Sequence, residues 1–259
     1  MASPASEIAS LFDGLADLYD EVRPGYPAAL VDDVLALSGI PASGAILEVG
    51  CGTGQATRLF AARGHRMTCI EPGSNLAART LANCRAWPEV SVVNARFEDW
   101  PAPEATFDLV IAAQSFHWID PAVAYAKAGR CLRASGALAL FWNWPVHWDR
   151  KLRDVLDRAY QRHGLGERAM ARKPRMIQVE GCIEATGLFG PVRIERYPWT
   201  DRRSAEEYVK LLRTHSDHAS LPADVLRSLC AEIRAAVEEA GGEIAVDHVA
   251  VLYFALRRR

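Results

Sequence analysis

The first half of the chain alternates short apolar runs with longer amphipathic stretches. The runs have the length of buried strands, and glycines or polar residues punctuate them. The stretches between them carry apolar residues at helical spacing, and this alternation is typical of a doubly wound α/β fold with a parallel sheet. The predicted strands are Ala45–Val49, Arg66–Ile70, Val90–Asn94, Phe107–Ala112 and Ala137–Trp142, and the predicted helices are Thr53–Arg63, Ser74–Cys84 and Pro121–Leu132.

The second half of the chain is less regular. We predict helices over Leu152–Tyr160, Ile177–Thr186, Ser204–Arg213 and Ala223–Ala240, and strands over Val192–Trp199 and His248–Leu256. Ser204 with Glu207 three residues later forms a capping box. No repeat or low-complexity linker divides the chain, so we expect one domain over 1–259. Its parts are a helical cap over 1–40, a core over 41–143, and late strands over 144–259 with helical lid insertions at 144–173 and 204–242.

Composition and charge narrow the class of protein. Of 259 residues, 50% are hydrophobic and 24% are charged, which excludes a disordered chain. The net charge of −2 offers no basic excess for nucleic acid, and no apolar run approaches a membrane span. The start has no secretory leader pattern, and the six cysteines lack the spacing of a zinc site. We therefore expect a reduced, cytoplasmic protein without a structural metal.

A glycine-rich loop carries the strongest candidate chemistry. The string ILEVGCGTGQ over 46–55 follows a predicted strand and opens a predicted helix. Gly50, Gly52 and Gly54 let the backbone turn sharply and approach a ligand without obstruction by a Cβ atom. Glu71 ends the second strand nineteen residues after Gly52, where an acid can accept both hydroxyls of a ribose. The loop therefore predicts a nucleoside-containing ligand.

The spacing of the loop separates two classes of nucleoside ligand. A dinucleotide loop reads G-x-G-x-x-G, whereas this one reads E-x-G-x-G-x-G and has Gln55 where the third glycine would stand. Glu48 places a carboxylate near the loop, which suits an ammonium group better than a diphosphate. S-adenosyl-L-methionine combines a ribose with an α-amino acid end.

These motifs resemble those of the class I S-adenosylmethionine-dependent methyltransferases. The resemblance covers about residues 40–143 and rests on Glu48–Gly54, Glu71, Phe107–Val110 and Leu132–Trp142. It implies a mostly parallel, seven-stranded Rossmann-like sheet with a late antiparallel strand, for which His248–Leu256 is suited, and S-adenosyl-L-methionine as cofactor. Two further strings, at 19–27 and 113–120, resemble a subgroup of small-molecule methyltransferases that includes trans-aconitate methyltransferase-like enzymes.

The resemblance assigns a set of cofactor-binding residues. The backbone near Gln114 is expected to receive the methionine amine, while His117 and Trp118 wall the methyl-transfer site, unless these two side chains belong to the core. The expected set comes from the N-terminal helix, the glycine loop and the strand ends: Tyr19, Arg23, Glu48, Gly50, Cys51, Gly52, Thr53, Gly54, Glu71, Pro72, Phe97, Glu98, Asp99, Gln114, His117 and Trp118.

The two ends of the cofactor have separate candidate partners. Phe97, with either Glu98 or Asp99, is expected to border adenine, the alternative being a solvated loop. Tyr19 and Arg23 are expected to close the pocket from the N-terminal helix. Arg23 is the best candidate to pair with the methionine carboxylate, unless it is a surface residue.

The methyl acceptor has candidate residues in two clusters of the second half. One cluster follows the fifth strand, and its alternative is a packed hinge; the other lies between two late helices, and its alternative is a solvated helix end. We expect Arg213 to bind an acceptor carboxylate. The members of the first cluster are Asn143, Trp144, His147 and Trp148, and those of the second are Arg213, Thr214, His215, Ser216 and His218, of which Arg213 and His215 are the expected acceptor residues.

The expected reaction is methylation of a small molecule, on a carboxylate or hydroxyl oxygen, with a nitrogen or carbon acceptor as the alternative. A carboxylate acceptor needs no base, whereas a hydroxyl or amine would, and His117 or His147 is the candidate. A nicotinamide-dependent oxidoreductase and a non-catalytic nucleoside-binding protein are the rivals from other classes. A nicotinamide-dependent oxidoreductase would require a third glycine in the loop and a sixth parallel strand, and the sequence shows neither. Nucleic acid and membranes are not expected partners, and the oligomeric state is open.

Overall fold

The computed structural model describes residues 10–148, 150–166 and 178–258. Its centre is a seven-stranded sheet with the order β3-β2-β1-β4-β5-β7-β6. Strands β1 to β5 are parallel, and β7 enters antiparallel between β5 and β6. The predicted fold class, with its late antiparallel strand, is confirmed. The strands are β1 (Ala45–Val49), β2 (Arg66–Glu71), β3 (Val90–Asn94), β4 (Phe107–Ala113), β5 (Leu132–Trp148), β6 (Arg193–Ser204) and β7 (Glu243–Leu256).

Helices cover both faces of the sheet because successive strand residues point to opposite faces. Leu47 and Val110 belong to a core with α6 and α9, whereas the neighbouring Ile46 and Leu109 belong to a core with α3 and α4. All four side chains are fully buried. The helices of this part are α2 (Ala16–Val22), α3 (Ala28–Ser38), α4 (Thr57–Ala61), α5 (Ser74–Asn83), α6 (Pro121–Cys131) and α9 (Val179–Ala185).

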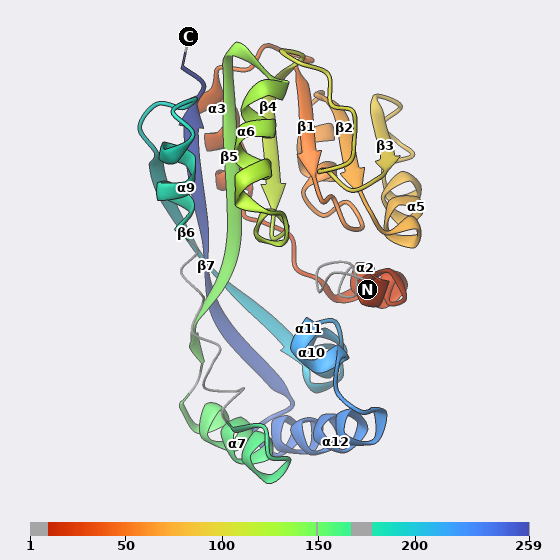
Figure 1. The fold of residues 1–259 in the computed structure, drawn as a ribbon. Helices are drawn as coiled ribbons and strands as arrows, with labels where there is room; N and C mark the ends of the chain where they lie inside the picture. Colours follow the sequence, from red (N-terminus) through yellow and green to blue (C-terminus); the bar gives the residue numbers. More distant parts are fainter. Residues whose placement is uncertain (1–9, 149, 167–177, 259) are drawn as a thin grey trace.

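Strands β5, β7 and β6 run on beyond the parallel sheet as an antiparallel ribbon (Figure 1). The ribbon leads to a helical layer with its own core, in which Leu212, Leu229 and Ile233 are fully buried. Figure 1 shows the arrowheads of β1, β2 and β4 pointing toward this layer. The layer consists of α7 (Arg150–Arg162), α10 (Ala205–Arg213), α11 (Ser216–Ala219) and α12 (Ala223–Glu239).

The ribbon corrects the predicted bounds of three strands. Strand β5 was predicted over 137–142 and is longer at both ends, β6 was predicted over 192–199 and ends later, and β7 was predicted over 248–256 and begins earlier. The strand residues that the prediction missed include charged ones such as Asp201, Arg203 and Glu243. Such residues interrupt the apolar run by which a buried strand is identified. Trp144, predicted to begin an insertion, therefore lies within β5. Residues 167–173 of that insertion, residues 1–9 of the cap, and Ile177 lie outside the described residues.

The glycine loop corrects one helix. The predicted helix over 53–63 is reduced to Thr57–Ala61, because residues 52–56 form turns. Gly52 and Gly54 adopt φ angles of 59° and 91°, which a helix does not allow. The capping box of α10 is confirmed: the Ser204 hydroxyl accepts from the Glu207 N–H, and the Glu207 carboxylate accepts from the Ser204 N–H.

Gly50 is the position where the loop tolerates a side chain least. Its φ is +71°, and a Cβ atom there would lie 2.5 Å from the Cβ of Ser115. We expect Gly50→Ala to lower the free energy of unfolding by about 2–4 kcal/mol, from left-handed strain plus overpacking. Gly64→Ala is the control, because its φ is +86° and no atom lies within 4 Å of its added Cβ. Urea unfolding measures both, and equal losses would contradict this account of the loop.

Candidate active site

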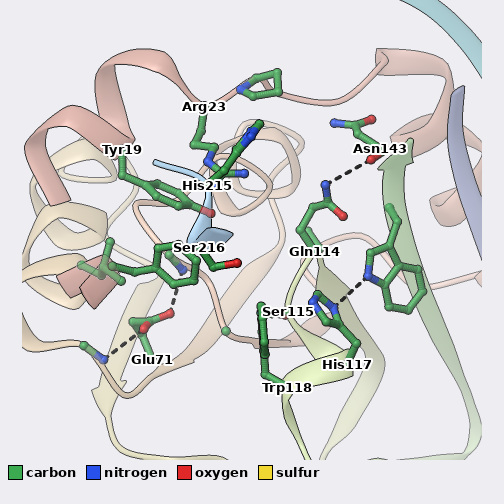
Figure 2. Close-up of a pocket in the computed structure, with 18 of the residues that line it drawn as sticks. Tyr19, Arg23, Glu71, Gln114, Ser115, His117, Trp118, Asn143, His215 and Ser216 are labelled. Atoms are coloured by element: carbon green, nitrogen blue, oxygen red, sulfur yellow. Dashed lines mark hydrogen bonds between the residues drawn. The ribbon is translucent and has the colours of Figure 1, made fainter. Parts of the chain in front are cut away.

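A cavity of about 900 Å³ lies between the carboxyl ends of the parallel strands and the helical layer. Its lining comes from the ends of β1, β2 and β4, from the N-terminal segment, and from the ribbon with α10 and α11. Figure 2 shows side chains from these regions around one space. Small-molecule sites usually measure roughly 300–1,000 Å³, so this cavity has room for a cofactor and a small acceptor together.

Glu71 ties the end of β2 to the glycine loop. Its two carboxylate oxygens accept from the backbone N–H groups of Gly52, at 2.9 Å, and Gly73, at 3.0 Å. The side chain is 5% exposed and lines the cavity, and burial raises its pKa to about 7 despite these two bonds. Each carboxylate oxygen retains a lone pair, so Glu71 can accept two further hydrogen bonds from a ligand.

The N-terminal segment closes one side of the cavity. The Arg23 guanidinium lies 4.7 Å from the centre of the Tyr19 ring, and both residues line the cavity. Arg23 Nε donates to the Thr214 hydroxyl at 3.0 Å, and Nη2 donates to the Thr214 carbonyl. Arg23 therefore joins the segment after α2 to the end of α10, and its remaining N–H groups are the part available to a ligand.

Gln114 ends β4 in a conformation that is uncommon for its residue type. Its φ is +60°, and non-glycine residues held there are strained by about 1–3 kcal/mol. Two bonds to β5 hold it: the Gln114 N–H donates to the Phe141 carbonyl at 3.1 Å, and its side-chain amide donates to the Asn143 carbonyl at 3.2 Å (Figure 2). The strand end thereby turns sharply at the wall of the cavity.

A hydrogen bond from Trp142 holds His117 in one tautomer. The Trp142 indole N–H donates to His117 Nδ1 at 3.2 Å, and an indole N–H can only donate. Nδ1 is therefore the acceptor nitrogen, and the ring proton is on Nε2. Burial lowers the pKa of His117 to about 4, although the ring is still reached from the cavity. A general base would have to take a proton on Nδ1 and lose the Trp142 bond, which argues against that role for His117.

Four expected cofactor residues of the loop do not line the main cavity. Glu48 is 1% exposed and accepts from the Thr57 hydroxyl at 2.6 Å. Glu48 and Cys51 border only a separate hollow of about 40 Å³, while Thr53 is fully buried and Gly54 faces Thr80. Within the loop it is Gly50 and Gly52 that reach the cavity.

Where the sequence places adenine, Pro72, Phe97 and Glu98 line the cavity. Arg96 holds Glu98 at 2.6 Å and Asp99 at 3.5 Å. Asp99 is outside the lining, and its side chain is 75% exposed. The structure therefore brings Glu98, rather than Asp99, to the cavity wall.

Only some of the expected acceptor residues line the cavity. Trp144 and His215 line the cavity, and Trp118, also there, is 39% exposed. Asn143 lines it too, but its amide is occupied: Nδ2 donates to the Gly25 carbonyl at 3.1 Å, and Oδ1 accepts from the Trp199 indole at 3.2 Å. Asn143 therefore joins three segments of the fold.

Three other expected acceptor residues do not meet in the described cavity. Arg213 is exposed on α10 and does not line it, so the structure does not bring this residue to the cavity, and its contact with an acceptor stays a prediction. The backbones of His147 and Trp148 pair with β7, but their side chains lie outside the described part of the chain.

Sequence reasoning missed the wall that the ribbon supplies. Asp201 and Arg203 from β6, Tyr208 from α10 and His248 from β7 all line the cavity. No motif marks them. The available signal was the period-two spacing of Trp199, Asp201 and Arg203, which places them on one face of a strand.

Residues 47–140 match the family described as the methyltransferase domain. An uncharacterised methyltransferase of Mycobacterium bovis is 30% identical over 150 residues, which are 57% of this chain and 59% of that protein. An uncharacterised methyltransferase-like protein of Schizosaccharomyces pombe is 26% identical over 225 residues, covering 83% of this chain and 81% of that protein.

Solved structures agree on the fold. A candidate type II methyltransferase from Anaeromyxobacter dehalogenans has a TM-score of 0.65 and 26% identity, over 90% of this chain and 97% of that one. A phosphoethanolamine N-methyltransferase 2 of Haemonchus contortus, solved with S-adenosylhomocysteine, has a TM-score of 0.58 and 15% identity, over 95% and 58%. Residues 47–140 therefore resemble a methyltransferase domain in sequence, and the chain shares its fold with solved methyltransferases. Among the described helices, none is long and apolar enough to cross a membrane.

The raised pKa of the buried Glu48 should make the free energy of unfolding depend on pH. Burial raises its pKa from the ordinary 4.5 to about 8, so between these values the folded protein holds a proton that the unfolded chain releases. The contribution of Glu48 to stability therefore falls as pH rises, by at most about 1.4 kcal/mol per pH unit. Glu48→Gln does not titrate, so its free energy of unfolding should gain on the wild type between pH 5.5 and 7.5. Urea unfolding across this range measures the difference, with the exposed Glu89→Gln as control, and parallel profiles would contradict the raised pKa of Glu48.

Proposed function

We propose that the chain is an S-adenosylmethionine-dependent methyltransferase that acts on a small-molecule acceptor. The observation that carries this proposal is the Glu71 carboxylate, which faces the cavity while bonded to the Gly52 backbone. A ribose that donates its hydroxyls to Glu71 would lie directly against Gly52, which has no side chain to obstruct it. The matched methyltransferase domain contains both residues.

The rest of the cofactor can follow from that point. Phe97 and Glu98 lie on the same wall as Glu71 and suit adenine, an aromatic surface beside an acceptor for its amine. On the other side, Gly50 and Gln114 offer backbone groups to the amino acid end, and Arg23 offers its remaining N–H groups to the carboxylate. This order would direct the sulfonium methyl toward the side of Trp118 and Trp144.

The reaction we propose is direct transfer of the methyl group to oxygen. A lone pair of the acceptor oxygen forms the new O–CH₃ bond, the S–CH₃ bond breaks, and its electron pair stays on sulfur as a neutral thioether. A carboxylate acceptor carries its own negative charge, so no proton has to leave. Since His117 is held as a donor, a carboxylate is favoured over a hydroxyl. Such a reaction depends mainly on holding both reactants in line.

Two features of the chain support a small acceptor. The cavity of about 900 Å³ is enclosed by the helical layer and the N-terminal segment, which we propose act together as a lid. The strings at 19–27 and 113–120 resemble small-molecule methyltransferases. Calorimetry with S-adenosylhomocysteine and with NAD tests the proposal: saturable binding of the first alone is expected, and preference for NAD would overturn it.

A substitution at Gly52 can test ligand binding apart from stability, because Gly39 has nearly the same φ angle but does not line the cavity. A Cβ atom there would enter the cavity 3.6 Å from the Tyr19 ring, at a φ of +59°. Gly39 has a φ of +58° with no atom within 4 Å of an added Cβ, so Gly39→Ala carries the same strain far from the cavity. We expect each alanine variant to lose about 1–2 kcal/mol of stability, and Gly52→Ala alone to weaken S-adenosylhomocysteine binding at least tenfold. Equal affinities in calorimetry would exclude Gly52 from the cofactor site.

Glu71 predicts how cofactor affinity depends on pH. The ionised carboxylate is the better acceptor for ribose hydroxyls, and the pKa of Glu71 is about 7. The affinity for S-adenosylhomocysteine should therefore fall as pH drops from 8 to 5.5. Glu71→Gln should bind more than tenfold more weakly at pH 8 and approach the wild type at pH 5.5. A constant ratio across this range, measured by calorimetry, would show that the carboxylate charge is not used.

A further inference from the structure

One face of the β6/β7 ribbon forms a wall of the cavity. In this antiparallel pair, Asp201 lies opposite Val246 and Arg203 lies opposite Ile244, and opposite residues share a face. All four line the cavity. The next pair on this face is Trp199 and His248, whose rings stack 4.8 Å apart. The wall therefore presents an ion pair beside two apolar side chains, followed by His248, which lines the cavity while Trp199 does not.

The ion pair with Asp201 orients the Arg203 guanidinium but occupies only one of its N–H groups. Arg203 Nε donates to Asp201 Oδ2 at 2.6 Å, and the two side chains are only 12% and 13% exposed. A guanidinium has five N–H groups, and Asp201 takes the one on Nε. The four N–H groups on Nη1 and Nη2 make no hydrogen bond to any residue that the structure describes.

The chemistry of that open edge selects its ligand. The paired Nη groups of arginine match the two oxygens of a carboxylate or a phosphate, in a bidentate contact. Ile244 and Val246 lie opposite Arg203 and Asp201 and add apolar surface beside them, where a charged hydrogen bond is stronger than in bulk water. A neutral group at this place would offer the Nη donors a weaker partner, and a cationic group would be repelled by the guanidinium.

We propose that Arg203 binds an oxoanion of the methyl acceptor, a carboxylate or a phosphate, so that the acceptors of this chain are small acids. The inference rests on the proposed function, which already favours a carboxylate acceptor, and adds the residue that would select an acid. Asp201 acts as a positioning residue, because it fixes the guanidinium at Nε and leaves the Nη edge toward the ligand.

The test uses the full chain saturated with S-adenosylhomocysteine and a matched set of probes. Benzoate and phenyl phosphate carry the two candidate oxoanions on one ring, while benzamide and benzylamine are their neutral and cationic counterparts. Succinate and acetate extend the acids to chains without a ring. Calorimetry should show binding of at least one acid, and comparison of benzoate with phenyl phosphate distinguishes the two oxoanions.

Three variants locate the effect. Arg203→Gln should weaken binding of the acid at least about thirtyfold, because a desolvated charge partner is lost. Arg203→Lys keeps the charge beside Asp201 but lacks the fork, so it should give an intermediate loss. Arg202→Gln is the control, since Arg202 is the neighbouring residue on the other face of the strand, 66% exposed and paired with Glu243. It should match the wild type within about twofold, and S-adenosylhomocysteine affinity should be unchanged in all three, which also reports that they fold.

The outcomes separate this inference from the proposed function. If S-adenosylhomocysteine binds but no acid does, or if benzamide or benzylamine is preferred, the oxoanion site is overturned and the cofactor assignment stands. The same holds if Arg203→Gln keeps the affinity for the acid, or if Arg202→Gln loses as much. Failure of the wild type to bind S-adenosylhomocysteine would overturn the proposed function, and this inference with it.

Discussion

The bond between the Glu71 carboxylate and the Gly52 N–H is the interaction on which the candidate site depends. It joins the end of β2 to the loop after β1, and the second bond, from Gly73, fixes the carboxylate at the start of α5. Since Gly52 carries no side chain, the bonded carboxylate remains open to the cavity. Its raised pKa is the consequence of holding an acid in such a place, where burial disfavours the charge and two backbone donors only partly compensate.

A second constraint is the distance between the parallel sheet and the helical layer. The long ribbon of β5, β7 and β6 sets this separation, and two polar contacts close its sides. Arg23 binds Thr214 across it, and the amide of Asn143 joins the N-terminal segment, β5 and β6. From the sequence, Arg23 was expected to bind the cofactor and Asn143 the substrate. Both polar atoms of the Asn143 amide form hydrogen bonds to other segments, so this side chain holds the cavity walls together.

The parallel part of the fold was predictable because its signals are local. Ile46, Leu47 and their neighbours form apolar runs that mark buried strands, and Gly52 and Glu71 lie at the spacing that a nucleoside site requires. The ribbon was predicted too short, since charged residues such as Arg203 face a cavity that only the assembled fold creates. For the same reason Arg213 was chosen as the anion-binding residue, although it is exposed on α10. The tautomer of His117 depends on a hydrogen bond from Trp142, twenty-five residues away, and no local sequence pattern predicts that bond.

A crystal structure of the chain with S-adenosylhomocysteine tests the central claim most directly. The account predicts the two ribose hydroxyls within hydrogen-bond distance of the Glu71 carboxylate, adenine beside Phe97, and the homocysteine end toward Gln114. The sulfur should then face the part of the cavity bordered by the ribbon. A ligand bound away from Glu71, or bound with adenine and amino acid ends exchanged, would contradict the claim that this carboxylate organises the site.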